Sequence, residues 1–207
     1  MKREIAVLFL PLLLLMVAGG CSNKVDYTVE PQFERSVVET IAVMPVGGDR
    51  GSEEGRLLFR EVANETLARS GYAVLPAEVV DKRLSSLTKG REGATDGVSR
   101  EEMIKALDVD TVLFITITKW ETPLLLYYAS IKIEAEFELY SRQGEKMWTA
   151  EYSLGDSDFS ADSDYLKVAV HGAYELMVVN LVDRVLATLP LRHRASTKGK
   201  GHFDWLP

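Results

Sequence analysis

The stretch Thr40-Ile-Ala-Val-Met-Pro-Val46 decides the fold class, because it contains no polar residue after Thr40. An uninterrupted apolar run of this length is typical of a strand buried on both faces, as parallel strands are when helices cover both sides of a sheet. The glycine-containing loop 47–51 follows. Ser52 then predicts a helix start, because its hydroxyl can cap the first turn, where Glu53 and Glu54 favour the positive end of the helix dipole. The order of strand, loop and helix indicates an α/β domain.

The rest of the first half continues with short helices and strands. Ser70-Gly71 ends the helix that starts after Ser52, and Ser99 with Glu102 forms a capping box that predicts a further helix start. The expected elements are a helix at 52–70, a strand at 72–76, a helix at 77–87, a loop at 88–98, a helix at 99–107 and a strand at 111–118.

The second half changes to an antiparallel pattern. Apolar and polar residues alternate strictly at 131–140, which predicts a strand with one face on the core and an acidic face in water. Gly144 suits a hairpin turn, a returning strand runs through Trp148 to Leu154, and a long apolar helix at 164–189 ends before Pro190. The order βαβααβββα predicts a three-layer-like α/β sandwich with a mixed parallel and antiparallel sheet.

The first 21 residues predict export and attachment of lipid. Lys2 and Arg3 precede the apolar run 5–17, which suits a secretory signal and is too short to span a bilayer comfortably. Cys21 is the only cysteine, so it cannot form an internal disulfide. The sequence Ala18-Gly-Gly-Cys21 resembles a bacterial lipobox, which implies cleavage before Cys21 and acylation of that residue. The alternatives are an ordinary secretory signal followed by a free thiol, and an uncleaved anchor.

This interpretation divides the chain into four parts. They are a signal peptide at 1–20 that is removed, a polar lipid-anchored linker at 21–36, an α/β domain at 37–190 and a basic tail at 191–207. Fully extended, the polar stretch 22–36 could reach about 50 Å from the membrane. Ser22 stands where lipoproteins retained at the inner membrane have aspartate, so the resemblance implies the periplasmic face of the outer membrane.

Composition argues against nucleic-acid binding, and the inventory of reactive side chains argues against catalysis. The formal net charge is −7, which disfavours contact with phosphate backbones. The histidines are His171, His193 and His202, without a Gly-x-Ser-x-Gly elbow or a His-Glu-x-x-His pair. His171 and Glu175 share a helix face, but two ligands do not make a zinc site. We expect no catalytic residue, no metal and no cofactor.

Two glycine- or aspartate-rich segments invite a ligand-binding interpretation that we do not favour. The loop 47–51 lacks a terminal lysine, and Asp49 lies in it, so a plain turn is favoured over a phosphate cradle. The run 156–164 carries alternating aspartates, but Ala161 and Lys167 replace the glycine and glutamate of a calcium loop. A solvated loop leading into the last helix is expected there.

Two other segments suit contact with a partner. The segment Trp120-Glu-Thr-Pro-Leu-Leu-Leu-Tyr-Tyr128 is apolar and aromatic where connections are usually polar. Its candidate partner-binding residues are Trp120, Leu125, Tyr127 and Tyr128. The alternative is that this segment extends both strands and packs in the core, in which case the acidic face of 132–138 is the contact surface. The tail 191–207 reverses the charge of the domain, and either docking or disorder is open for it.

These segments together resemble a known family. The resemblance lies in the lipobox and in Ile41-Ala-Val-Met-Pro-Val46, Gly71-Tyr-Ala-Val-Leu-Pro76 with Val80-Asp81, Asp110-Thr-Val-Leu-Phe-Ile-Thr-Ile-Thr-Lys-Trp120 and Gly144-Glu-Lys-Met-Trp148. The family consists of bacterial lipoproteins of unassigned function and is typified by a neisserial genome-derived antigen. It implies a periplasm-facing lipoprotein with a fold similar to the TolB amino-terminal domain and to CsgG-like lipoproteins, and it implies no known catalytic residues.

The expected function is a lipid-anchored, non-catalytic binding or assembly module of the cell envelope. Its expected partners are the membrane, through acylated Cys21, and other envelope lipoproteins or proteins, with a homo-oligomer also open. One alternative is a subunit of an oligomeric CsgG-like secretion channel, which needs additional long alternating segments for a barrel. Another is an unrecognised hydrolase, which needs a deep polar pocket with perturbed carboxylates.

Overall fold

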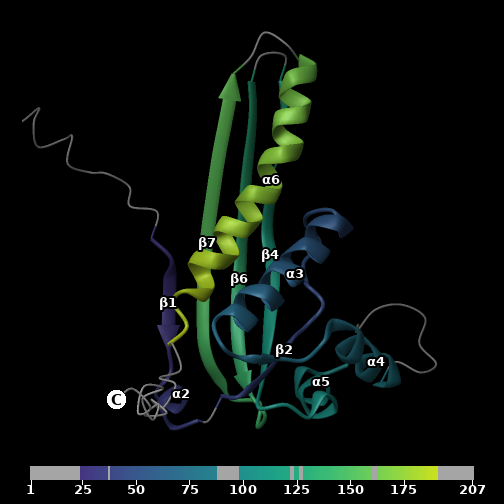
Figure 1. Cartoon of the computed structure of the whole chain (residues 1–207), viewed down its shortest axis with the longest axis vertical. Coiled ribbons are helices and arrows are strands. Elements are labelled where there is room, and N and C mark those ends of the chain that lie inside the picture. Colours follow the sequence, from purple (N-terminus) through teal and green to yellow (C-terminus); the bar gives the residue numbers. More distant parts are fainter. Residues whose placement is uncertain are drawn as a thin grey trace, which may run out of the picture.

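One mixed sheet organises the part of the chain that the computed structural model describes, residues 24–36, 38–87, 98–121, 124–125, 128–159 and 163–190 (Figure 1). The sheet has seven strands in the order β1-β7-β6-β4-β2-β3, with β5 paired to β6. The strands are β1 (Asp26–Val29), β2 (Thr40–Val43), β3 (Ala73–Val74), β4 (Thr111–Glu121), β5 (Leu124–Leu125), β6 (Tyr128–Ser141) and β7 (Lys146–Phe159). The helices are α2 (Pro31–Arg35), α3 (Glu53–Arg69), α4 (Ala77–Leu87), α5 (Arg100–Leu107) and α6 (Ser163–Leu186).

The two halves of the sheet have opposite strand senses, as the sequence predicts. β2 pairs in parallel with both β3 and β4, whereas β4, β6, β7 and β1 pair antiparallel in succession. The turn between β6 and β7 contains Gly144 with φ 84°, a conformation that glycine adopts without steric cost. The mixed α/β sandwich is therefore confirmed.

Helices cover the two faces of the sheet unequally. Ile41 and Val43 of β2 join the main core, which contains α3 and α6, whereas Ala42 and Met44 join a smaller cluster with α4 and α5. This alternation confirms burial on both faces for residues 41–44 of the run, whereas Pro45 is exposed and Val46 is half-buried. The smaller cluster reaches β6 only at Tyr140 and contains no residue of β7 or β1. Figure 1 shows α6 and α3 lying together over the sheet, and α4 and α5 gathered beside β2.

The alternating strand also folds as predicted. Ile131, Ile133, Ala135, Phe137 and Leu139 are all buried in the main core. Their neighbours on β7 include Tyr152, Ala150 and Trp148, which complete the inner face of the hairpin. The predicted capping box at Ser99 and the predicted bounds of α4 also agree with the structure.

The amino-terminal segment differs from the expected linker. Residues 26–29 form β1, which pairs with β7 at Tyr27↔Ala150, and α2 follows with Phe33 buried. A strand of only four mostly exposed residues shows no apolar alternation, and its partner strand lies more than 100 residues away, so the local sequence carried no signal for it. Of the expected linker, only residues 22–25 separate Cys21 from the folded sheet.

The aspartate-rich run also differs from expectation. Residues 156–159, expected in a loop, belong to β7, and α6 begins at Ser163. Pairing with β6 continues to Tyr128↔Phe159, so the hairpin is longer than its apolar alternation indicates. No helix in the described part of the chain is long and apolar enough to cross a membrane.

Candidate functional site

Trp120, the first candidate contact residue, packs against the main core. Its half-buried ring lies 5.9 Å from the ring of Tyr174 on α6. A Cβ built on Gly55 of α3 would lie 2.8 Å from Cη2 of Trp120, so the glycine permits this approach. These contacts match the alternative in which this part of the segment belongs to the core.

A strand irregularity explains why Trp120 faces the helices. Ile117 points into the core, and strict alternation would turn a residue three positions later to the opposite face. The register between β4 and β6 shifts between Ile117 and Lys119, which places Trp120 opposite the buried Ile133. The shift restores the ring to the core face.

Two other candidate contact residues, Leu125 and Tyr128, lie at the end of the sheet that we call the sheet tip, formed by β5, Tyr128 and Phe159. Leu125 of β5 pairs with Tyr128 of β6, and Tyr128 pairs with Phe159 of β7. Tyr127 lies outside the described residues. In Figure 1, β6 and β7 extend past α3 to the end of the sheet where α6 begins.

The predicted acidic face lies on the side of β6 opposite the main core. The negative charge of one of its carboxylates, Glu138, is balanced by two neighbouring cations. Glu138 accepts a hydrogen bond from Lys146 and pairs with Arg100 at 3.1 Å. Partial burial opposes ionisation of Glu138, but the hydrogen bond from Lys146 and the two positive charges outweigh it and hold the pKa of Glu138 below its ordinary value. Burial, followed by the charge of Glu138, raises the pKa of the neighbouring Tyr140.

Three further carboxylates on this face form a row across the strands. Glu136 of β6 lies opposite Glu151 of β7, and Glu151 lies opposite Asp26 of β1. We call these three residues the acidic strip. They border a shallow groove of about 120 Å³ that Thr28 and Thr149 also line. Among the residues that the structure describes, no cation forms an ion pair with the strip.

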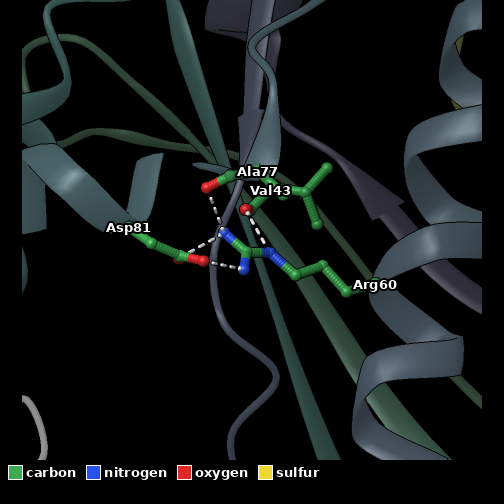
Figure 2. A network of polar contacts seen from close by, with 4 residues as sticks. All are labelled: Val43, Arg60, Ala77 and Asp81. Atoms are coloured by element: carbon green, nitrogen blue, oxygen red, sulfur yellow. Dashed lines mark hydrogen bonds and ion pairs between the residues drawn. The ribbon is translucent and has the colours of Figure 1, made fainter. Parts of the chain in front are cut away.

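A buried arginine, absent from the sequence-based expectations, ties α3 to the strand and helix beside it (Figure 2). The side chain of Arg60 is 8% exposed and donates to both carboxylate oxygens of Asp81 on α4, at 2.9 and 2.8 Å. It also donates to the backbone carbonyl of Val43, at 3.2 Å, and to that of Ala77. Because these partners take four of the five N–H donors of Arg60, the arrangement joins α3 to β2 and α4 and makes a ligand-binding role for this arginine unnecessary.

The glycine loop and the cavity at the opposite end of the sheet have structural explanations. A Cβ on Gly48 would lie 2.3 Å from the carbonyl oxygen of Ile117, so the loop needs glycine to approach β4.

The cavity of about 290 Å³ is lined by Asp110 and Arg142, among others. Asp110 accepts hydrogen bonds from the backbone and hydroxyl of Thr40, which commits it to joining β2 and β4.

The predicted histidine and cysteine positions fall mostly outside the described side chains. His171 lies in α6, in a part where side chains are not described, and His193 and His202 lie outside the described residues. Within that described part, no group of three or more histidine, cysteine, aspartate or glutamate residues could hold a metal ion. Cys21 also lies outside it.

The family model described as "Putative lipoprotein GNA1162-like" matches residues 25–193. The chain belongs to this family. The GNA1162-like assignment confirms the resemblance inferred from the sequence. A relative also named as a lipoprotein, NMB1124/NMB1162 of Neisseria meningitidis serogroup B, is 26% identical over 162 residues, which are 77% of this chain and 73% of the relative.

Solved structures of other proteins are similar to this GNA1162-like chain. The PelC L103M dodecamer of Paraburkholderia phytofirmans matches with a TM-score of 0.50 and 16% identity, over 79% of this chain and 96% of PelC. Lipoprotein GNA1162 of Neisseria meningitidis matches with a TM-score of 0.48 and 22% identity, over 67% of this chain and 97% of that protein.

Proposed function

We propose that this GNA1162-like protein is a lipid-anchored, non-catalytic binding or assembly module on the periplasmic face of the outer membrane. The observation that carries the proposal is the position of the lipobox Ala18-Gly-Gly-Cys21, which ends five residues before β1 in a chain of a lipoprotein family. Residues 22–25 can span about 15 Å at roughly 3.3–3.6 Å each. An acylated Cys21 therefore holds the β1 edge of the sheet close to the lipid surface, and several acyl chains make that attachment stable.

Replacement of Cys21 tests the anchor. Cells expressing wild-type protein, Cys21→Ala or the matched control Ser22→Ala are labelled with an alkyne analogue of palmitate and fractionated. Wild type and Ser22→Ala should carry the label in the membrane fraction, whereas Cys21→Ala should be unlabelled and either soluble or held as precursor. Mature wild-type protein that is soluble and has a free thiol would contradict the proposal.

The choice of membrane has its own test. Density-gradient separation should place wild-type protein in the outer membrane fraction. Ser22→Asp, which creates the inner-membrane retention signal that the lipobox resemblance implies, should move it to the inner membrane. Wild-type protein already in the inner membrane would leave the anchor intact but overturn the outer-membrane location.

The proposed partner surface is the sheet tip. Leu125, Tyr127 and Tyr128 are apolar or aromatic residues in a connecting segment, and tyrosine is among the residue types that most often carry interface energy. Trp120, the fourth member of the candidate set, has its ring against Gly55, so we assign it the role of holding the end of β4 in place beneath that surface.

The test therefore leaves Trp120 unchanged. The triple variant Leu125→Ser, Tyr127→Ser and Tyr128→Ser should lose the envelope proteins that cross-link to wild type, with a nearly unchanged melting temperature. Leu87→Ser, at an exposed leucine on α4, is the matched control and should retain them. Retained partners in the triple variant, or a sharp fall in its melting temperature, would show that these side chains do not form the partner surface.

Self-association is a second candidate, favoured by the open edge of β7. In the described part of the chain, β1 pairs with β7 at 148–151 whereas β7 continues to Phe159, and a strand edge without a partner is a template for another strand. The structural neighbour PelC is described as a dodecamer. Native mass spectrometry of wild type and Ser153→Lys should show an oligomer that the edge lysine disrupts, and a monomeric wild type would exclude this candidate.

A further inference from the structure

Among the residues that the structure describes, the helices cover only part of the sheet face opposite α3 and α6. The cluster that contains α4 and α5 includes residues of β2, β4 and the end of β6, but none of β7 or β1. In the described part of the chain, the acidic strip of Asp26, Glu136 and Glu151 lies on this uncovered portion, with Asp26 and Glu151 exposed and Glu136 half-buried. The charge of this surface is therefore accessible to an occupant.

The negative charges of the acidic strip repel one another. Like charges directly opposite each other on neighbouring strands destabilise a sheet, and both neighbouring pairs in the strip are of this kind. Three cations that flank β6 are engaged elsewhere: Arg100 and Lys146 pair with Glu138, and Lys132 lies 3.9 Å from Glu134. A cationic segment on the groove beside the strip would relieve the repulsion.

The chain itself provides such a segment. The tail 191–207 carries Arg192, Arg194, Lys198 and Lys200 against a single acidic side chain, Asp204. Charge complementarity thus connects the tail to the strip. The family match ends at residue 193, so most of the tail is a feature of this chain outside the part that its family shares.

The point where the tail leaves the domain favours the same occupant. Leu189 is buried in the main core, and the carbonyl oxygen of Pro190 accepts a hydrogen bond from the Tyr72 hydroxyl at 3.1 Å. In Figure 1 the last described segment, in yellow, ends at the side of the sheet formed by β7 and β1. The strip crosses three strands, about 10 Å, whereas the tail can extend about 55 Å.

We propose that the basic tail 191–207 passes around the β1 edge and docks its arginine and lysine side chains on the acidic strip of its own chain. Exposed ion pairs are individually weak, but a short tether gives the tail an effective concentration of about 1 mM at the strip, so a weak intrinsic affinity is enough for docking. The docked tail neutralises the strip and keeps other basic ligands from it until the tail is displaced. This inference does not depend on the partner surface proposed at the sheet tip.

Trypsin cleavage after Lys198 and Lys200 measures docking in the full-length protein. Glu136→Gln with Glu151→Gln removes two of the three charges, and two surface ion pairs are together worth roughly a 2- to 30-fold factor in affinity. We expect several-fold faster release of the tail from this variant. Glu61→Gln with Glu65→Gln, at exposed carboxylates on α3, is the matched control and should match wild type. Added salt at 0.5 M should accelerate cleavage of wild type more than that of the strip variant, because it screens exposed pairs.

A zero-length carbodiimide cross-linker provides the geometric readout. It should join the amine of Lys198 or Lys200 to Asp26, Glu136 or Glu151 within a monomer, as identified by peptide mass spectrometry. Equal cleavage rates in wild type and the strip variant would overturn the proposal, as would the absence of these cross-links. Cross-links found only in dimers would also overturn it, because the occupant would then be the tail of a second copy.

Discussion

Replacing Gly55 with alanine is expected to destabilise the domain by about 1–2 kcal/mol, although the same change at an ordinary helix position is stabilising by up to about 1 kcal/mol. The added Cβ would stand 2.8 Å from Cη2 and 3.1 Å from Cζ3 of Trp120. The ring cannot retreat freely, because Gly51 lies under its Cε3 and Tyr174 lies 5.9 Å from it. Overpacking of this kind costs about 1–3 kcal/mol, which exceeds the gain in helix propensity.

A double-mutant cycle isolates the contact. Urea unfolding of wild type, Gly55→Ala, Trp120→Leu and the double variant should give a coupling energy of about 1–3 kcal/mol. In the Trp120→Leu background the alanine should be neutral or stabilising by about 0.5 kcal/mol, because the ring that it meets is gone. Ala68→Gly, at an exposed position of the same helix, measures the effect of helix propensity alone on the free energy of unfolding.

A coupling energy near zero would refute this reasoning. It would mean that, in solution, the ring of Trp120 does not pack against Gly55 and that α3 does not hold the ring in place. Trp120 would become available to the partner surface beside Leu125, as the original four-residue set expects.

Two further predictions concern the charged contacts. Asp81→Asn leaves the guanidinium of Arg60 buried without its counter-ion and should lower the free energy of unfolding, measured in urea, by about 2–3 kcal/mol. Adding Arg60→Met should recover part of that loss. A double variant less stable than Asp81→Asn would contradict this prediction. Because the pKa of Glu138 is lowered in the folded state, its stabilisation is complete above the ordinary glutamate value of 4.5 and is lost as pH falls through the lowered pKa. The melting temperature of wild type should therefore fall more steeply below pH 4.5 than that of Glu138→Gln, and equal slopes would contradict this.

The elements predicted correctly from the sequence were those in which the local spacing of apolar residues indicates which side chains are buried. β2 is a continuous apolar run and β6 alternates strictly, so their environments followed from the pattern alone. The bounds of α4 and the capping box of α5 were also predictable, because end signals lie within a few residues of the helix. β1 and α2 were missed, because both are short, β1 shows no apolar alternation, and the β7 strand that pairs with β1 lies far away in the sequence.

The candidate site was predictable in composition but not in arrangement. The apolar character of 120–128 and the acidic face of β6 are visible in the sequence. The direction of Trp120 is not, because it depends on a register shift between β4 and β6. The acidic strip also combines residues from three strands, of which one, β1, was expected to be a linker.

The sequence by itself determined the fold class, the family, the predicted lipid attachment at Cys21 and the charge of the domain and its tail, because each is encoded in residue type and short spacing. Only the tertiary structure decided which side chains meet. α4 brings Asp81 to a buried Arg60, β4 shifts register to return Trp120 to the core, and β1 adds Asp26 to the row begun by Glu136 and Glu151. Each of these contacts joins segments that are distant in the chain, and no local pattern encodes the distance between two such segments once the sheet has assembled.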